Sequence, residues 1–257
     1  MRVVKSTYYS NWGDLFGYKI AHFVLPALVK IKFLTPNQIT LVSFLSFAIG
    51  CFLLLFPIFP INIIAGLLIF AGYVGDDIDG QFARETKKYS IIGDYLDKVL
   101  DVVKIFLVTF FSALAVYFQS GNIVFILVGF IACFAFLLRY YIKLETMFSA
   151  FSRDDKYMDK SAKKRAELEH EMDIFYGKTP KNIPEFLRSL WIKNRMIFIV
   201  DEAEFAIFTA IGAALGQLWV SLVIIATAQV AVVIWRAFER GIQLMNGSEN
   251  LVRPLRK

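Results

Sequence analysis

Six apolar stretches recur along this chain, each about as long as a helix that crosses a lipid bilayer. Such a helix needs roughly 20 mostly apolar residues, and the stretches lie at about 38–58, 61–79, 92–118, 122–143, 196–215 and 218–238. Hydrophobic residues make up 57% of the 257 residues, which is typical of an integral membrane protein and not of a soluble one. We therefore expect an all-α membrane protein with six transmembrane helices.

The basic residues predict how these helices are oriented. The short connections at residues 57–61, 119–122 and 216–218 contain no Lys or Arg. Because cytoplasmic loops carry the excess of basic residues, we expect both termini and the segment 145–195 on the cytoplasmic side. The net charge of +6 suits contact with anionic lipid headgroups, and nothing in the sequence indicates a nucleic-acid partner.

Two further segments are expected to be helical without crossing the membrane. Residues 12–33 have apolar side chains at helical spacing, which predicts an amphipathic helix on the cytoplasmic leaflet or, equally well, a helix packed on the protein. We assign it to an N-terminal region, 1–37, that precedes a membrane domain, 38–257. The insert at about 145–195 is rich in Lys and Glu and is expected to form a solvated cytoplasmic helix, with a substrate lid as the alternative.

An acidic run lies between two of the apolar stretches. Asp76 and Asp79 are three residues apart, and Asp97 and Asp101 are four apart, so each pair shares one face of a helix. With only the loop 80–92 between them, the two helix ends are expected to be neighbours. Four converging carboxylates would repel one another unless a cation neutralised them, and oxygen ligands favour Mg²⁺ or Mn²⁺.

The other residues of this run suit a metal-bound diphosphate. Gly80, Ala83 and Gly93 lack bulky side chains, so that a ligand can approach the backbone. Arg84 offers a planar guanidinium to phosphate oxygens. The plain alternative is that the carboxylates pair with nearby cations; these are Arg84, Lys98 and Lys104.

A second segment is expected at the same membrane depth as Asp76. Thr35 and Pro36 predict a helix start, with Thr35 as the N-cap residue. Asn37 follows directly, so it is expected to face the polar site.

The acidic run resembles the signature of the CDP-alcohol phosphotransferases, D-x2-DG-x2-AR-x8-G-x3-D-x3-D, and every fixed position is matched. The segment Thr35-Pro36-Asn37-x-x-Thr40 and the six-span layout are similar as well. The resemblance implies an enzyme that transfers a substituted phosphate from a CDP-alcohol to an acceptor hydroxyl and releases CMP. It also implies a homodimer and a role in phospholipid biosynthesis.

The resemblance further implies a role for each matched residue. Asp76, Asp79 and Asp97 would bind a first divalent cation, and Asp101 would help to hold a second and act as general base. The nucleotide and its phosphates would contact the remaining motif residues and Asn37, namely Gly80, Ala83, Arg84, Gly93 and Asn37.

The two alcohols are less well determined by the sequence. A CDP-diacylglycerol donor with a small polar acceptor is favoured, and CDP-choline or CDP-ethanolamine with a lipid acceptor is the alternative. Basic residues near the ends of the later spans, among them Arg139, Lys143 and Arg236, are candidate substrate contacts or simple membrane anchors. Glu202 lies in an acidic cluster, 201–204, that calls for a substrate ammonium or an internal partner.

Two other classes of protein remain open. A transporter would also bury carboxylates, although it would place them at mid-membrane on an aqueous path. A relative that binds CDP-lipids without turnover would be expected to lack the last carboxylate of the run, yet Asp101 is present.

Overall fold

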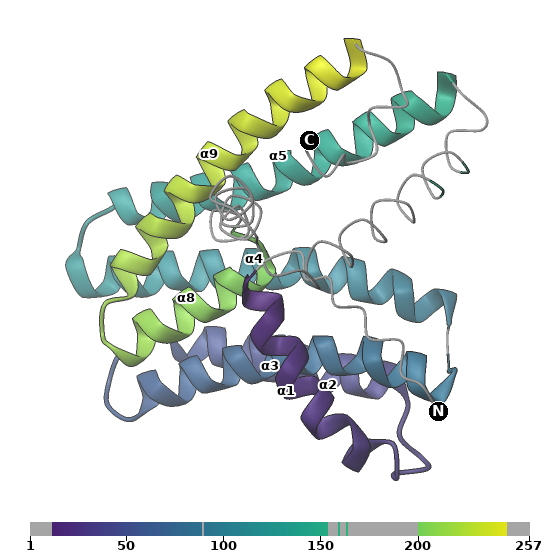
Figure 1. The fold of residues 1–257 in the computed structure, drawn as a ribbon. Helices are drawn as coiled ribbons and strands as arrows, with labels where there is room; N and C mark the ends of the chain where they lie inside the picture. The colour runs from purple at the N-terminus through teal and green to yellow at the C-terminus, as the bar shows by residue number, and fades with distance from the viewer. Residues whose placement is uncertain (1–11, 89, 154–158, 160–162, 164–199, 246–257) are drawn as a thin grey trace, which may run out of the picture. The chain divides into compact units, whose positions relative to one another are not determined.

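The computed structural model describes residues 12–88, 90–153, 159, 163 and 200–245. Among these residues, all the secondary-structure elements are α-helices (Figure 1). The helices are α1 (Trp12–Leu28), α2 (Pro36–Leu53), α3 (Ile61–Thr86), α4 (Ile91–Ser120), α5 (Val124–Arg153), α8 (Glu202–Ala214) and α9 (Leu218–Met245). The prediction of an all-α fold is therefore confirmed.

The chain divides into two compact units. The first, here called the motif unit, comprises residues 11–134 and 200–229, and the second comprises residues 1–10, 135–199 and 230–257. The motif unit contains the whole acidic run.

Five helices are long and apolar enough to cross a membrane; the segments concerned are 36–53, 61–86, 91–120, 124–152 and 218–242. They correspond to five of the six expected spans. The remaining one was expected at 196–215, where α8 has only 13 residues and residues 196–199 lie outside the described part. The described helices thus support a multi-pass membrane protein with five candidate spans, and the sixth stays a prediction.

Helix α3 is longer than the sequence indicated. Its apolar stretch was expected to end near residue 79, with a loop from Gly80 onward, but the helix continues to Thr86. Lys87 then adopts a left-handed conformation, with φ 55°, and its N–H donates to the carbonyl of Ala83. The connection to α4 is therefore only a few residues long, and Asp76, Asp79 and Ala83 all lie on a continuous helix.

The starts of α2 and α4 are stabilised by side-chain caps. Thr35 and Gln38 form a reciprocal capping box, with Pro36 in the first turn of α2, as the sequence predicts. At α4, the Ser90 hydroxyl accepts a hydrogen bond from the Gly93 N–H at 2.9 Å. These caps satisfy N–H groups that a helix leaves without internal partners.

Helices α2 and α3 approach each other closely and run side by side (Figure 1). A Cβ atom at Gly75 would lie 2.1 Å from the Ser43 hydroxyl, and one at Gly72 would lie 2.7 Å from the Ser43 carbonyl oxygen. Small residues allow such contact between membrane helices. The close approach brings the residues that follow Gly75 on α3 next to the first turns of α2.

Helix α1 packs against α3 and α8. A Cβ atom at Gly17 would lie 2.7 Å from the Tyr73 hydroxyl and 2.1 Å from a carboxylate oxygen of Asp77. Ala21 and Leu25 are buried. Of the two interpretations that the sequence left open for this segment, the described contacts match a helix packed on the protein.

The insert predicted at about 145–195 begins later than expected. Helix α5 continues as a single element to Arg153, so residues 145–153 belong to it. Within this extension, Ala150 is buried and packs against Leu244, and both residues belong to the second unit. The rest of the predicted cytoplasmic helix lies almost entirely outside the described residues.

Candidate metal and nucleotide centre

Three carboxylates of the acidic run converge. Asp76 on α3 and Asp97 and Asp101 on α4 each offer an oxygen atom, and these atoms all lie within 4.8 Å of one another. Asp97 and Asp101 are one helical turn apart, so they share a face of α4. The expectation that the ends of the two helices are neighbours is met at these residues.

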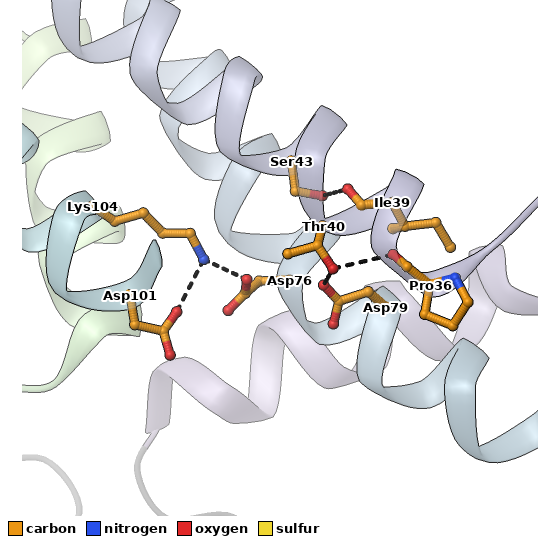
Figure 2. Close-up of polar contacts among 8 residues, drawn as sticks. All are labelled: Pro36, Ile39, Thr40, Ser43, Asp76, Asp79, Asp101 and Lys104. Carbon is orange, nitrogen blue, oxygen red and sulfur yellow. Dashed lines mark hydrogen bonds and ion pairs between the residues drawn. The ribbon is translucent and has the colours of Figure 1, made fainter. Parts of the chain in front are cut away.

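Lys104 lies between two of these carboxylates (Figure 2). Its ammonium donates to Asp76 Oδ1 and, at 3.1 Å, to Asp101 Oδ1. The Lys104 side chain is only 6% exposed. The alternative of internal pairing with cations is therefore partly realised, most directly by Lys104, whereas Lys98 forms its ion pair with Asp94.

Asp79 points to helix α2 instead of into this group. Its Oδ2 accepts a hydrogen bond from the Thr40 hydroxyl at 2.5 Å, and Thr40 is also within 3.1 Å of the Pro36 carbonyl oxygen (Figure 2). Asp79 is buried. Its expected role as a metal ligand stays a prediction, and Thr40 is the residue that orients its carboxylate.

Asp77 is the additional carboxylate of the run, and it lies on a different side of α3. The contact of its Oδ2 with the position of Gly17 places it at the interface with α1. Because residues one apart on a helix point in directions about 100° apart, Asp76 and Asp77 serve different surfaces. Asp76 joins the carboxylate group, and Asp77 belongs to the packing of α1.

The small residues of the run lie beside polar side chains. The Arg84 guanidinium folds back toward Gly80, where an added Cβ atom would lie 3.4 Å from it. A Cβ atom at Gly93 would lie 2.8 Å from Asn37 Oδ1. Gly93 and Asn37 come from different helices, so this contact places Asn37 beside one residue of the acidic run, and its role in nucleotide binding stays a prediction.

The acidic cluster at the start of α8 separates into different roles. Glu204 is fully buried, and its Oε2 accepts a hydrogen bond from the N–H of Asp201 at 2.9 Å, which closes the start of the helix. Glu202 instead lies close enough to interact electrostatically with Asp101, Asp76 and Lys104. Glu202 is thus the member of this cluster that borders the carboxylate group.

The basic residues that the sequence nominates for the substrate belong to the second unit. The Arg139 guanidinium lies 4.8 Å from the centre of the Phe136 ring, and the Lys143 ammonium lies 5.3 Å from that of Tyr140. Arg236 forms an ion pair of 2.6 Å with Glu239. Their role as substrate contacts stays a prediction.

Two residues of the centre were not singled out as functional from the sequence. Thr40 was noted only within its motif, and Lys104 only as a possible partner. The available signal for Lys104 was its spacing of three residues from Asp101 and seven from Asp97, which places all three side chains on one helix face.

These features define a class of protein: a multi-helix membrane protein in which carboxylates converge where two helices meet. Residues 33–162, just over half of the chain, match the sequence profile described as CDP-alcohol phosphatidyltransferase. The match includes the whole acidic run and Asn37. The chain belongs to the CDP-alcohol phosphatidyltransferase family, which confirms the resemblance.

A curated relative is similar over a shorter stretch. It is a protein of Archaeoglobus fulgidus named "Bifunctional IPC transferase and DIPP synthase", 44% identical over 66 residues. The aligned part covers 26% of this chain and 13% of the relative.

The donor atoms of the centre fit a hard divalent cation. Asp76, Asp97 and Asp101 supply oxygen ligands from two helices within a small volume, and Mg²⁺ and Mn²⁺ prefer such ligands together with phosphate oxygens. The carboxylate group can therefore hold a metal ion.

Proposed function

We propose that this protein transfers a substituted phosphate group from a CDP-alcohol to the hydroxyl of a second alcohol, with release of CMP. The observation that carries the proposal is the convergence of Asp76, Asp97 and Asp101 from two helices within a motif that matches the family. One or two divalent cations bound there would neutralise the diphosphate and polarise its phosphorus.

The residues of the chain would divide the work as follows. Asp76, Asp79 and Asp97 hold the first divalent cation, and Asp101 helps to hold the second. The nucleotide lies against Gly80, Ala83 and Gly93, where a larger side chain would obstruct it, with Arg84 on its phosphate oxygens and Asn37 beside Gly93. These assignments follow the family motif and the neighbours described above.

In the transfer itself, the acceptor oxygen forms a bond to the β-phosphorus of the donor. The bond from that phosphorus to the bridging oxygen breaks, and its electron pair leaves with CMP. Asp101 takes the proton of the acceptor hydroxyl, or orients the hydroxyl while the proton passes to solvent. Placing the reacting groups correctly supplies much of the rate in such displacements.

For the substrates, we favour CDP-diacylglycerol as donor and a small polar alcohol as acceptor. Arg139, Lys143 and Arg236 would then contribute to acceptor recognition. The alternative is CDP-choline or CDP-ethanolamine with a lipid acceptor, in which case Glu202, beside the carboxylate group, would face the ammonium headgroup.

The membrane arrangement is part of the proposal. The chain forms six spans, with α8 as part of the fifth, and the termini and the carboxylate group face the cytoplasm. Residues 1–37 form an N-terminal region and 38–257 the membrane domain. The protein acts as a homodimer, as the family resemblance implies.

The test is Mg²⁺-dependent CMP release by purified protein, measured with a panel of CDP-alcohols and acceptors. We expect release that disappears in Asp101→Asn and on chelation, and that persists in Asp94→Asn, which changes a carboxylate of the same helix outside the group. Release from CDP-diacylglycerol supports the favoured branch, and release only from CDP-choline or CDP-ethanolamine supports the other. Nucleotide binding without release from any donor would contradict the enzyme and favour a CDP-lipid binder.

A further inference from the structure

Lys104 is the cation built into the carboxylate group of α3 and α4. Its ammonium contacts one oxygen of Asp76, on α3, and one oxygen of Asp101, on its own helix. The side chain is 6% exposed, whereas those of Asp76 and Asp101 are each 20% exposed. The ammonium therefore lies on the protein side of the group, with the carboxylates between it and the more open side.

These contacts involve two of the carboxylates that a divalent cation would also use. Asp76 and Asp101 both belong to the three carboxylates that can hold a metal ion. A second ion shared between Asp76 and Asp101 would have to bind two carboxylates whose Oδ1 atoms the ammonium already contacts. Two cations that share a carboxylate in a site of low dielectric repel each other strongly.

Lys104 leaves the rest of the group available. Asp97 forms no contact with it among the hydrogen bonds and ion pairs of the described residues, and Asp76 and Asp101 each retain a second oxygen. One divalent cation can therefore bind at Asp97 and its neighbours while the ammonium stays in place. The charge of Lys104 supplies the neutralisation that a second ion would otherwise give to Asp76 and Asp101.

We propose that Lys104 takes the place of the second divalent cation as long as no nucleotide is bound, so that the resting protein holds one divalent ion. The inference rests on the metal centre of the proposed function. Lys104 is then a positioning residue: it keeps Asp76 and Asp101 together across the two helices, and the second ion enters only with the diphosphate, whose oxygens are additional ligands.

The test is a titration of nucleotide-free, purified protein with Mn²⁺, in which free and bound Mn²⁺ are distinguished by electron paramagnetic resonance. We expect one bound ion in the wild type and in Lys104→Arg, and two in Lys104→Met. In Lys104→Met the first ion should also bind at least about tenfold more tightly, because a neighbouring positive charge is gone. Lys98→Met is the matched control, since Lys98 pairs with Asp94 on the same helix, and it should bind one ion with nearly wild-type affinity.

Thermal unfolding supplies a second measurement. With a chelator present, Lys104→Met should unfold at a lower temperature than the wild type, and Mn²⁺ should raise its unfolding temperature by more than it raises that of the wild type. A residue with only a packing role would lower the unfolding temperature without enlarging the Mn²⁺ effect.

Several outcomes would overturn the inference. Two ions in the nucleotide-free wild type would do so even if Lys104→Met failed to fold. The inference would also be overturned if Lys104→Met and the wild type bound the same number of ions with the same affinity. The proposed function would survive that result if CMP release persisted. An absence of Mn²⁺ binding in every variant would remove both the inference and the metal-dependent function.

Discussion

Helix α4 carries two lysines, each paired with aspartate, in opposite environments. Lys98 pairs with Asp94 one turn earlier, and their side chains are 55% and 74% exposed. Lys104 pairs with Asp76 and Asp101, and its side chain is 6% exposed. The first pair is local to one helix, and the second joins two helices.

The difference shows that the burial of an ion pair, and not its presence alone, decides how much the charged residue contributes. An exposed pair of this kind contributes at most about 1 kcal/mol, because water solvates both partners. In a buried group, removal of one partner leaves a charge that neither water nor protein neutralises, and the cost is several-fold larger. The buried group around Asp101 and Lys104, and not the exposed pair of Asp94 and Lys98, is where charge changes should alter metal binding and activity.

The largest effect is expected when the carboxylate group of Asp76, Asp97 and Asp101 loses one of its members. Asp76→Asn removes one of the three converging carboxylates and the α3 partner of Lys104. Metal assistance is worth several kcal/mol in such reactions, so CMP release should fall by at least about 100-fold. Initial rates at saturating Mg²⁺ measure this, and a loss smaller than about tenfold would contradict a metal role for Asp76.

A smaller effect is expected when the packing that positions Asp76 is disturbed. Gly75→Val places side-chain atoms where Ser43 lies, and overpacking of this kind costs about 1–3 kcal/mol. The unfolding temperature should fall, and Mn²⁺ affinity should fall with it. Gly241→Ala is the control, because no heavy atom lies within 4 Å of the added Cβ, and equal effects of the two changes would refute this account.

The hydrogen bond to Asp79 provides a more selective test. Thr40→Val keeps the shape of the side chain but removes the hydroxyl that donates to Asp79. Loss of a residue that orients a metal ligand typically lowers metal affinity about 10–100-fold, and Mn²⁺ titration should show this. Ser46→Ala is the control. Ser46 lies farther along α2, and its hydroxyl donates to the Leu68 carbonyl of α3, so its loss should leave the Mn²⁺ affinity as in the wild type.

The smallest effect is expected at the exposed pair. Asp94→Asn should change stability by less than about 1 kcal/mol and CMP release by no more than about twofold, because Asp94 is solvated and outside the converging carboxylates. Thermal unfolding and initial rates check both values. A loss comparable with that of Asp76→Asn would mean that the comparison between the exposed and the buried lysine of α4 is wrong.

Much of the centre could be predicted because its spacing is that of a helix. Residues three and four apart on a helix share a face, so the pairs of aspartates, the capped start at Thr35 and the helical fold all follow from local sequence. Asn37 was expected beside the run because it follows the predicted start of a helix, and its side chain lies next to Gly93.

The length of α3 and the extent of α5 were misjudged from hydropathy. Asp79 ends an apolar stretch but does not end the helix, because Thr40 of α2 donates a hydrogen bond to its carboxylate and its side chain is buried. Hydropathy measures the solvent that a segment prefers, whereas helix length also depends on the partners that it meets.

By itself, the sequence determined the family, the helical class and the residues that can bind a cation, because these depend on residue types and on spacing along one chain. Only the tertiary structure decided which carboxylates meet. It assigned Asp76 to the converging group, Asp79 to Thr40 and Asp77 to the interface with α1, and it placed Lys104 between two helices. The reason is physical: a helix presents its residues in several directions, and the packing of its neighbours decides which direction faces a ligand.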